Sequence, residues 1–256
     1  MSVQKTQLFK DAFYFLRTNF TIFLIVSILT SSVIIELHNY IILKFISDTY
    51  HDSYFTKNND NFPEVTDSFF FKTKLHFIII FIIKLVLHSL YNAILIGTIL
   101  STIYLICKEK HCSFFSITEK STSILLPLFM LQVLNHMLIA LGTMIFMLPG
   151  MILQLLLLLS PVILFFNKKN IFYSIKNSIF ISKNHIFFII FSNMLFSYIK
   201  IYISLIVSTL LSDFNDSNNI YLLIMHSANN FSYIILYIIL YRFYSLQKLD
   251  TESKNN

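Results

Sequence analysis

Long apolar runs separated by short polar segments dominate the pattern of this chain. A helix needs about 20 apolar residues to cross a hydrocarbon core ~30 Å thick, because lipid cannot satisfy the hydrogen bonds of exposed backbone groups. The pattern therefore predicts an all-α fold, a polytopic membrane helical bundle that forms one multi-pass domain over residues 1–256. The six predicted spans cover approximately residues 20–37, 84–107, 125–147, 151–166, 186–210 and 220–241.

The boundaries of these spans follow from breaks in the apolar pattern. The second run begins at Leu75 and is too long for one perpendicular span, so residues 75–83 are assigned to an interfacial lead-in. Two short spans are the alternative for this run. Pro149 and Gly150 separate the third and fourth spans and predict a tight helical hairpin. The polar segment SDFNDSNN at 212–219 separates the fifth span from the sixth.

The positions of lysine and arginine predict the orientation. These cations are retained on the cytoplasmic side of a membrane protein. With both termini in the cytoplasm, the outer side holds only Lys57, Lys72 and Lys74. The cytoplasmic side then holds Lys5, Lys10, Arg17, Lys108, Lys110, Lys120, Lys168, Lys169, Lys176, Lys183, Arg242, Lys248 and Lys254. With an odd number of spans, these cationic segments would not all lie on the cytoplasmic side.

Four segments outside the predicted spans have distinct sequence patterns. Residues 47–74 form an external loop that is too short to bury a core of its own, and residues 242–256 form a cytoplasmic tail. Residues 1–19 form a cytoplasmic amphipathic lead, and the segment 171–180 is amphipathic as well. We expect both amphipathic helices to lie at the inner head-group surface. Their apolar faces are formed by Leu8, Ala12, Phe15 and Leu16, and by Phe172, Ile175 and Ile179.

Composition and charge narrow the class of partner. The chain is 56% hydrophobic and 12% charged, with a mean hydropathy of +0.70, so lipid is its main solvent. The net charge of +6 resides at span ends rather than in a basic run, which argues against nucleic acid as a partner. Cys107 and Cys112 are expected to be reduced thiols. Membrane lipids and a membrane-protein partner are the expected contacts, and the oligomeric state is left open.

The motifs of membrane enzymes are absent from the sequence. It contains no H-E-x-x-H, no G-x-S-x-G and no pair of acids within a span. With 3 glycines, a glycine-rich phosphate loop is excluded. We therefore expect no catalytic residues, no metal site and no cofactor.

Polar residues inside the predicted spans are the candidate functional positions. Such side chains are costly in lipid, so they face other helices or a wet cavity. One hypothesis is an outward-facing polar cleft for a small solute or a lipid head group, with Glu36 countering Lys200 or Lys84. The alternative, which we favour, is that they only bond helix to helix. The candidate set is Glu36, Lys84, His88, Asn92, Gln132, His136, Asn193, Lys200, His226 and Asn230.

Three segments of the chain resemble a known family. They are residues 11–29, 124–185 and 233–248, and the most specific part is the spacing of Pro149-Gly150, Pro161, Ser174, Ser178 and Lys183. These segments are similar to the YciC family of bacterial inner-membrane proteins. The resemblance implies a multi-pass protein of the plasma membrane in a Gram-negative bacterium. It implies no catalytic or ligand-binding residues, because none is established for that family.

Two functions from different classes are compatible with these observations. The first is a non-enzymatic protein that handles a lipid or a membrane-protein partner in envelope upkeep. The second is a small-solute transporter or channel subunit, for which inverted repeats or broken helices at matching places in the two halves are expected.

Overall fold

Helices make up every regular element that the computed structural model describes. It describes residues 2–33, 35–36, 67–108, 113–167, 170–210 and 219–253. This confirms the predicted all-α class. The predicted loop up to residue 66, the end of the first span at residue 37 and the last three residues of the tail lie outside the described residues. The helices are α1 (Ser2–Thr18), Phe20–Val33, α3 (Asp67–Cys107), α4 (Phe114–Ile145), α5 (Met147–Leu157), α6 (Ser160–Asn167), α7 (Ile171–Asn184), α8 (Ile186–Leu210) and α9 (Asn219–Ser253).

The N-terminal helix α1 is amphipathic, as predicted, and its apolar face is turned to protein. Leu8, Ala12 and Phe15 are buried, and α1 packs against α9. The ring of Phe9 also meets Phe191 of α8 edge to face, with centroids 5.4 Å apart. The apolar face of α1 is thus covered by α9 and α8, and the position of this helix at the inner head-group surface stays a prediction. The chain then bends by 77° between α1 and the helix Phe20–Val33.

The second apolar run forms one helix. α3 continues without interruption from Asp67 to Cys107, so the alternative of two short spans is wrong. The helix begins at Asp67, inside the segment predicted as loop, because helical hydrogen bonds continue through the polar residues that precede the apolar run. Its part from Phe81 to Cys107 is long and apolar enough to cross a membrane.

The tight hairpin between α4 and α5 is present, but its turn lies earlier than predicted. The break falls at Phe146, whose extended backbone (φ −156°, ψ 152°) ends α4 and starts α5. Pro149 lies in the first turn of α5, where it costs no helical hydrogen bond because the first amides of a helix have no intrahelical partner. Gly150 lies against α4: a Cβ placed there would be 2.9 Å from the backbone nitrogen of Thr143. The glycine thus lets the two backbones touch.

The fourth predicted span is broken into α5 and α6. In a continuous helix, the backbone N–H of residue 161 would donate to the carbonyl of Leu157. Residue 161 is a proline and has no N–H. The hydroxyl of Ser160 donates to that carbonyl instead, at 2.7 Å. Two hydroxyls of α7, from Ser178 and Ser182, donate to the carbonyl of Leu156 at 2.6 and 3.2 Å. Hydroxyl groups therefore satisfy the backbone where the helix is interrupted.

A serine face of α7 packs against this break. Its fully buried side chains are Ser174, Ser178 and Ser182, four residues apart on one face. Phe172, on the apolar face of a helix predicted to lie at the head-group surface, is 76% exposed. The hydroxyl face is buried because it supplies donors to the broken helix, and the aromatic side chain is left at the surface.

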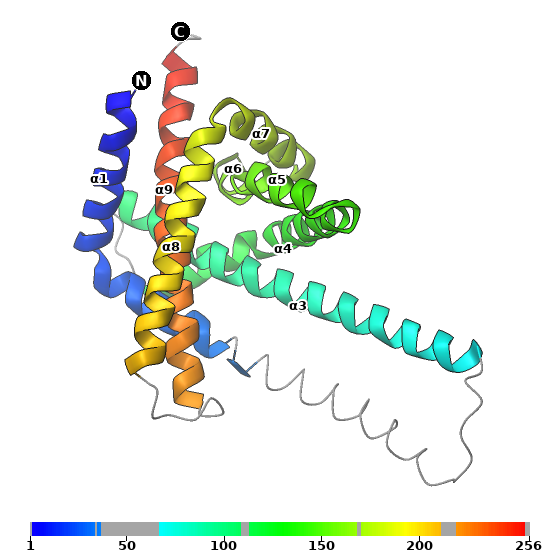
Figure 1. Ribbon diagram of the computed structural model, residues 1–256. Helices are drawn as coiled ribbons and strands as arrows, with labels where there is room; N and C mark the ends of the chain where they lie inside the picture. Colours follow the sequence, from blue (N-terminus) through cyan, green and yellow to red (C-terminus); the bar gives the residue numbers. More distant parts are fainter. Residues whose placement is uncertain are drawn as a thin grey trace.

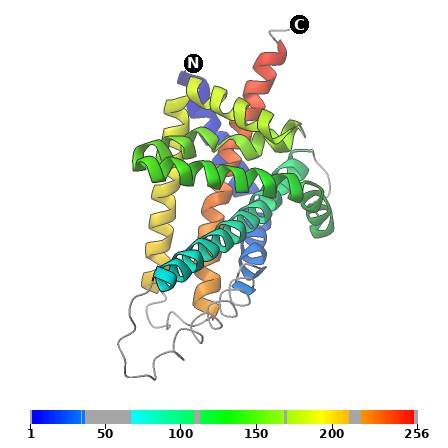
Figure 2. The same cartoon turned by 90° about the vertical axis from the view of Figure 1, so that its right-hand side faces the viewer.

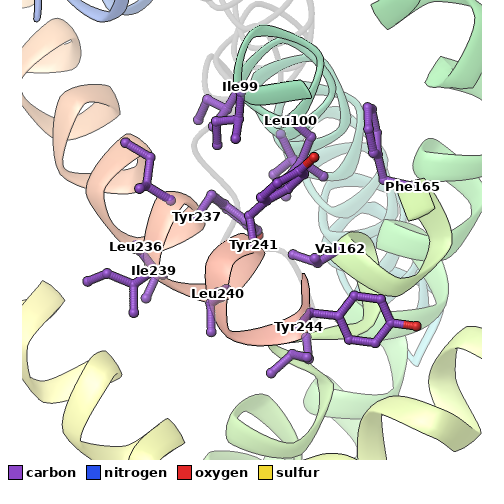
Figure 3. Close-up of a cluster of buried hydrophobic side chains, with 14 of the residues drawn as sticks. Ile99, Leu100, Val162, Phe165, Leu236, Tyr237, Ile239, Leu240, Tyr241 and Tyr244 are labelled. Atoms are coloured by element: carbon purple, nitrogen blue, oxygen red, sulfur yellow. The ribbon is translucent and has the colours of Figure 1, made fainter. Parts of the chain in front are cut away.

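The hydrophobic core lies where α3, α6 and α9 meet. Figure 3 shows Ile99 and Leu100 from α3, Val162 and Phe165 from α6, and Tyr241 from α9 gathered in one cluster. The sixth predicted span continues beyond residue 241, and Phe243 and Tyr244 are buried. Residues 242–253 of the predicted tail are therefore part of α9, and the first residues of this stretch pack in the core.

The helices do not all run in one direction. The start of α1 and the end of α9 lie at the same end of the molecule (Figure 1). Figure 2 shows the α4–α5 hairpin and α7 running crosswise to α8 and α9. By length and composition, five described helical segments qualify as spans, or six if α1 and Phe20–Val33 count as one bent span.

Candidate functional site

A buried asparagine in α9 joins three helices. Asn230 is completely buried, and its Nδ2 donates to the hydroxyls of Thr30 at 3.1 Å and Ser31 at 2.9 Å in the first hydrophobic helix. Its Oδ1 accepts a hydrogen bond from the hydroxyl of Tyr91 in α3, at 2.5 Å. Both amide hydrogens and the amide oxygen are therefore used within the protein. The predicted site residue Asn230 bonds helix to helix.

A second cluster joins α3 to α4 through two histidines. Asn92 Nδ2 lies 3.1 Å from His88 Nε2 and 3.3 Å from His136 Nε2. With this orientation of the carboxamide, both Nε2 atoms accept and each neutral ring carries its proton on Nδ1. Nδ1 of His136 then donates to Ser89 Oγ at 2.9 Å, and Ser89 donates to the Leu85 carbonyl at 2.7 Å. The chain of bonds is complete with both rings neutral, so this cluster also acts as a helix-to-helix contact.

A third contact links α4 to the broken helix. Asn135 Nδ2 donates to Ser160 Oγ at 2.9 Å, and both side chains are buried. Asn135 Oδ1 is buried and has no hydrogen-bond partner. Gln132, one turn earlier, is buried as well. The predicted patch on the third span therefore faces the protein interior.

The fifth predicted span provides a groove with a different character. Along α8, Asn193, Ser197 and Lys200 line an open cleft of about 640 Å³ together with residues of α5 and α9. We call this cleft the α8 groove. Its described lining residues are Gln154, Asn193, Phe196, Ser197, Lys200, Ile201, Ser204, Leu205, Ser208 and Tyr233.

Lys200 lies close to an aromatic ring in this groove. Its ammonium nitrogen is 5.9 Å from the centroid of the Tyr233 ring, at the outer limit of a cation–π contact. The structure does not bring the predicted partners together: Glu36 is exposed and forms no ion pair with Lys200 or Lys84. Lys84 is itself exposed on α3. The predicted countering of these lysines by Glu36 is therefore wrong.

The ten predicted positions thus fall into separate places. His88, Asn92 and His136 form one cluster and Asn230 another, Gln132 is next to the Asn135 contact, and Asn193 and Lys200 share the α8 groove. His226 is half-buried on α9, one turn before Asn230. One common cleft for all ten residues is not formed.

Several participating residues were not predicted. Tyr91, Ser89 and Ser160 make interhelical bonds, and Gln154 lines the α8 groove. The hydroxyl cluster Thr30, Ser31 and Ser32 in the first apolar run was a usable signal, since consecutive polar residues are unusual in lipid-facing helix. Tyr91 gave no comparable signal, because its ring fits an apolar face equally well.

Side chains that commonly ligate metals are dispersed in the described part of the chain. No group of three or more His, Cys, Asp or Glu side chains there is arranged to hold an ion. Cys107, at the end of α3, is a free and exposed thiol. The polar groups of the three interhelical clusters are neutral donors and acceptors, and the α8 groove adds the ammonium of Lys200.

Comparison with known proteins places the chain in a family. Neither the curated proteins nor the solved structures include a significant match. A family model, described as an uncharacterised protein family, UPF0259, matches residues 1–246. The match covers every helix from α1 to most of α9, so the protein is a multi-pass membrane protein that belongs to family UPF0259.

Proposed function

We propose that this protein is a non-enzymatic component of the bacterial inner membrane that binds a membrane lipid through the α8 groove. The observation that carries this proposal is the contrast between its polar residues. Asn92, Asn135 and Asn230 bond to other helices inside the protein, whereas the polar residues of α8 line an open groove. The groove is therefore an open polar surface at which a ligand can bind.

The surroundings of the α8 groove favour a lipid over a soluble solute. α8 exposes large apolar side chains along its length, among them Phe187, Phe191, Tyr198, Ile201 and Leu205. A helix with such a surface faces hydrocarbon in a membrane protein. A ligand that enters the groove from this side carries acyl chains, which replace the contacts that neighbouring lipids make with α8.

The location and orientation belong to the same proposal. The resemblance of residues 11–29, 124–185 and 233–248 to the YciC family supports the inner membrane of a Gram-negative bacterium. The cationic flanks support both termini on the cytoplasmic side. An envelope role in which the protein handles lipid, alone or with a membrane-protein partner, is consistent with both.

A small-solute transporter or channel subunit is the second candidate. The broken helix α5–α6 favours it, because transporters place interrupted helices at their binding sites. However, α3 in the first half runs unbroken over its 41 residues, and hydroxyl groups of α6 and α7 cap the break. The first half also contains an interruption, the 77° bend between α1 and Phe20–Val33. We favour lipid binding because bonded hydroxyl groups fill the break of α5–α6, whereas the α8 groove is open.

Purification in native lipid discs tests the proposal. We expect mass spectrometry of the released contents to show one lipid class enriched over the surrounding membrane. A matched control is an unrelated multi-pass protein purified in the same way from the same cells. A lipid content equal to that of the control would contradict the proposal. Altered accumulation of a small solute in deletion cells, with unchanged lipids, would favour the transporter.

A further inference from the structure

The polar residues of the α8 groove form a continuous stripe along one helix. Asn193, Ser197, Lys200, Ser204 and Ser208 follow one another at intervals of three or four residues, which places them on one face of α8. At 1.5 Å per residue, the stripe is roughly 22 Å long. It therefore extends through most of a hydrocarbon core ~30 Å thick.

A cation, Lys200, lies at the centre of this stripe. Lys200 is near the middle of α8, which runs from Ile186 to Leu210. No carboxylate is among the described residues that line the groove. A lysine at the centre of a span costs ~2.5–3.5 kcal/mol on insertion scales and calls for a partner. The ring of Tyr233 at 5.9 Å is a weak partner by comparison with an anion.

The other polar groups around Lys200 are suited to an oxyanion. Asn193 and Gln154 contribute carboxamide donors, and Ser204 and Tyr233 contribute hydroxyl groups. An ammonium ion surrounded by neutral donors binds phosphate oxygens through charge-assisted hydrogen bonds. Apolar side chains of Phe196, Ile201 and Leu205 lie beside them in the same groove. The groove thus combines a site for an oxyanion with surfaces for hydrocarbon.

We propose that the α8 groove binds the phosphate of an anionic phospholipid at Lys200, with the acyl chains lying along the apolar surface of α8. This inference rests on the proposed lipid-binding function and specifies its ligand. The phosphodiester supplies the negative charge that the described lining residues lack. The length of the stripe allows the head group to enter the groove from the membrane surface while it remains in contact with polar side chains.

Titration of the full-length protein with lipid tests this proposal. The probe is dioleoyl phosphatidylglycerol added to protein in phosphatidylcholine nanodiscs, with retention measured by native mass spectrometry. We expect Lys200→Gln to weaken retention of phosphatidylglycerol by roughly tenfold or more, the loss of one charge-assisted hydrogen bond. Lys200→Arg keeps the charge and should restore most of the retention. Lys84→Gln is the matched control, because it removes an exposed cation of α3 that is not part of the groove.

The outcomes separate the possible sources of the phosphate group. If inorganic phosphate competes with phosphatidylglycerol for wild-type protein at similar concentrations, the lipid source is overturned and the ligand is a free anion. Equal retention by wild type and Lys200→Gln, with matching thermal stability, overturns the role of Lys200 but leaves lipid binding intact. Absence of any retained lipid in wild type contradicts the proposed function itself.

Discussion

The hydroxyl of Tyr91 in α3 donates a hydrogen bond to Oδ1 of Asn230 in α9, at 2.5 Å, across 139 positions of sequence. The same carboxamide donates to Thr30 and Ser31 in the first hydrophobic helix. One side chain therefore ties together three helices from the beginning, middle and end of the chain. In a bilayer, where apolar packing between helices has no hydrophobic driving force, such bonds help to select the correct neighbours.

The first prediction concerns Asn230. We expect Asn230→Leu to lower the free energy of unfolding by about 1–2 kcal/mol, since it removes three interhelical hydrogen bonds that average ~0.6 kcal/mol each. The measurement is denaturation of the purified protein in mixed micelles. Asn229→Leu is the control, because this neighbouring residue is half-buried and does not belong to the cluster. Equal destabilisation by both variants would contradict the role assigned to Asn230.

The helices were predictable from the sequence because apolar length decides membrane insertion. The range 186–210 predicted for the fifth span coincides with α8. The ends of the helices were harder to predict from the sequence. α3 begins at Asp67 and α9 reaches Ser253, because backbone hydrogen bonds continue a helix through polar residues. The hydrophobic pattern does not indicate how far a helix continues beyond its apolar part.

The candidate site was predictable in part. The stripe Asn193, Ser197 and Lys200 was visible from its spacing, and the structure places all three in one groove. The separation of His136 and Asn230 into distinct clusters depends on which helices touch, which spacing along one helix does not determine. The burial of Ser178 was missed because hydrophobic patterning assigns serine to the polar face, whereas here a broken helix provides the acceptor for its hydroxyl.

The second prediction concerns the contact between α4 and α5. A methyl group at Gly150 would lie 2.9 Å from the nitrogen and 3.1 Å from the Cα of Thr143, and would overlap the Thr143 methyl. Backbone atoms cannot move aside without separating the helices. We expect Gly150→Ala to cost about 1–3 kcal/mol of stability, the usual range for overpacking, measured as before.

Gly97→Ala provides the comparison for this prediction. At Gly97, a methyl group would lie 3.1 Å from the Ser121 hydroxyl and 3.4 Å from a Leu128 side-chain carbon. Side chains can rotate away, so the cost should be clearly smaller than at Gly150. A larger effect at Gly97 would show that the hairpin backbones are not in tight contact.

The third prediction concerns the hydroxyl caps of the broken helix. In Ser178→Ala with Ser182→Ala, the buried carbonyl of Leu156 loses both hydroxyl donors. We expect the double variant to be less stable by about 1–3 kcal/mol, the cost of an unsatisfied buried polar group, and each single variant to lose less because one donor remains. Ser174→Ala is the control, since this buried hydroxyl donates to its own helix at Asn170. Additive single losses would argue against a shared acceptor.

The fourth prediction concerns membrane topology. We expect alkaline carbonate to leave the protein in the membrane fraction, because its apolar helices hold it in the bilayer. A fluorescent protein fused after the last residue should fold in the cytoplasm, whereas alkaline phosphatase at the same position should be inactive. An alkaline phosphatase inserted after residue 55, in the predicted external loop, should be active. Activity of the carboxyl-terminal phosphatase fusion would refute the cytoplasmic assignment.

The last prediction concerns the tip of the α4–α5 hairpin. Met144, Ile145, Phe146, Met147 and Leu148 are each at least 70% exposed and carry no polar side-chain group other than the thioethers. Exposure of these side chains to water would be unfavourable by roughly 1.5–3 kcal/mol each. The hairpin also runs crosswise to α8 and α9 (Figure 2). We therefore expect the tip to lie in the hydrocarbon.

Spin labels can locate this tip in a background where Cys107 and Cys112 are replaced by serine. A label on Phe146→Cys should be more accessible to oxygen, which concentrates in hydrocarbon, than to a water-soluble nickel complex. A label on Phe115→Cys, exposed at the start of α4, should show the reverse. Lys120 and Lys176 flank the hairpin. They lie on the same side of the membrane whether the tip stays in the hydrocarbon or the hairpin crosses the bilayer as two spans, so the cation count does not distinguish these two arrangements. Preference of the Phe146 label for the nickel complex would mean that the tip reaches water and that the hairpin crosses the bilayer as two spans.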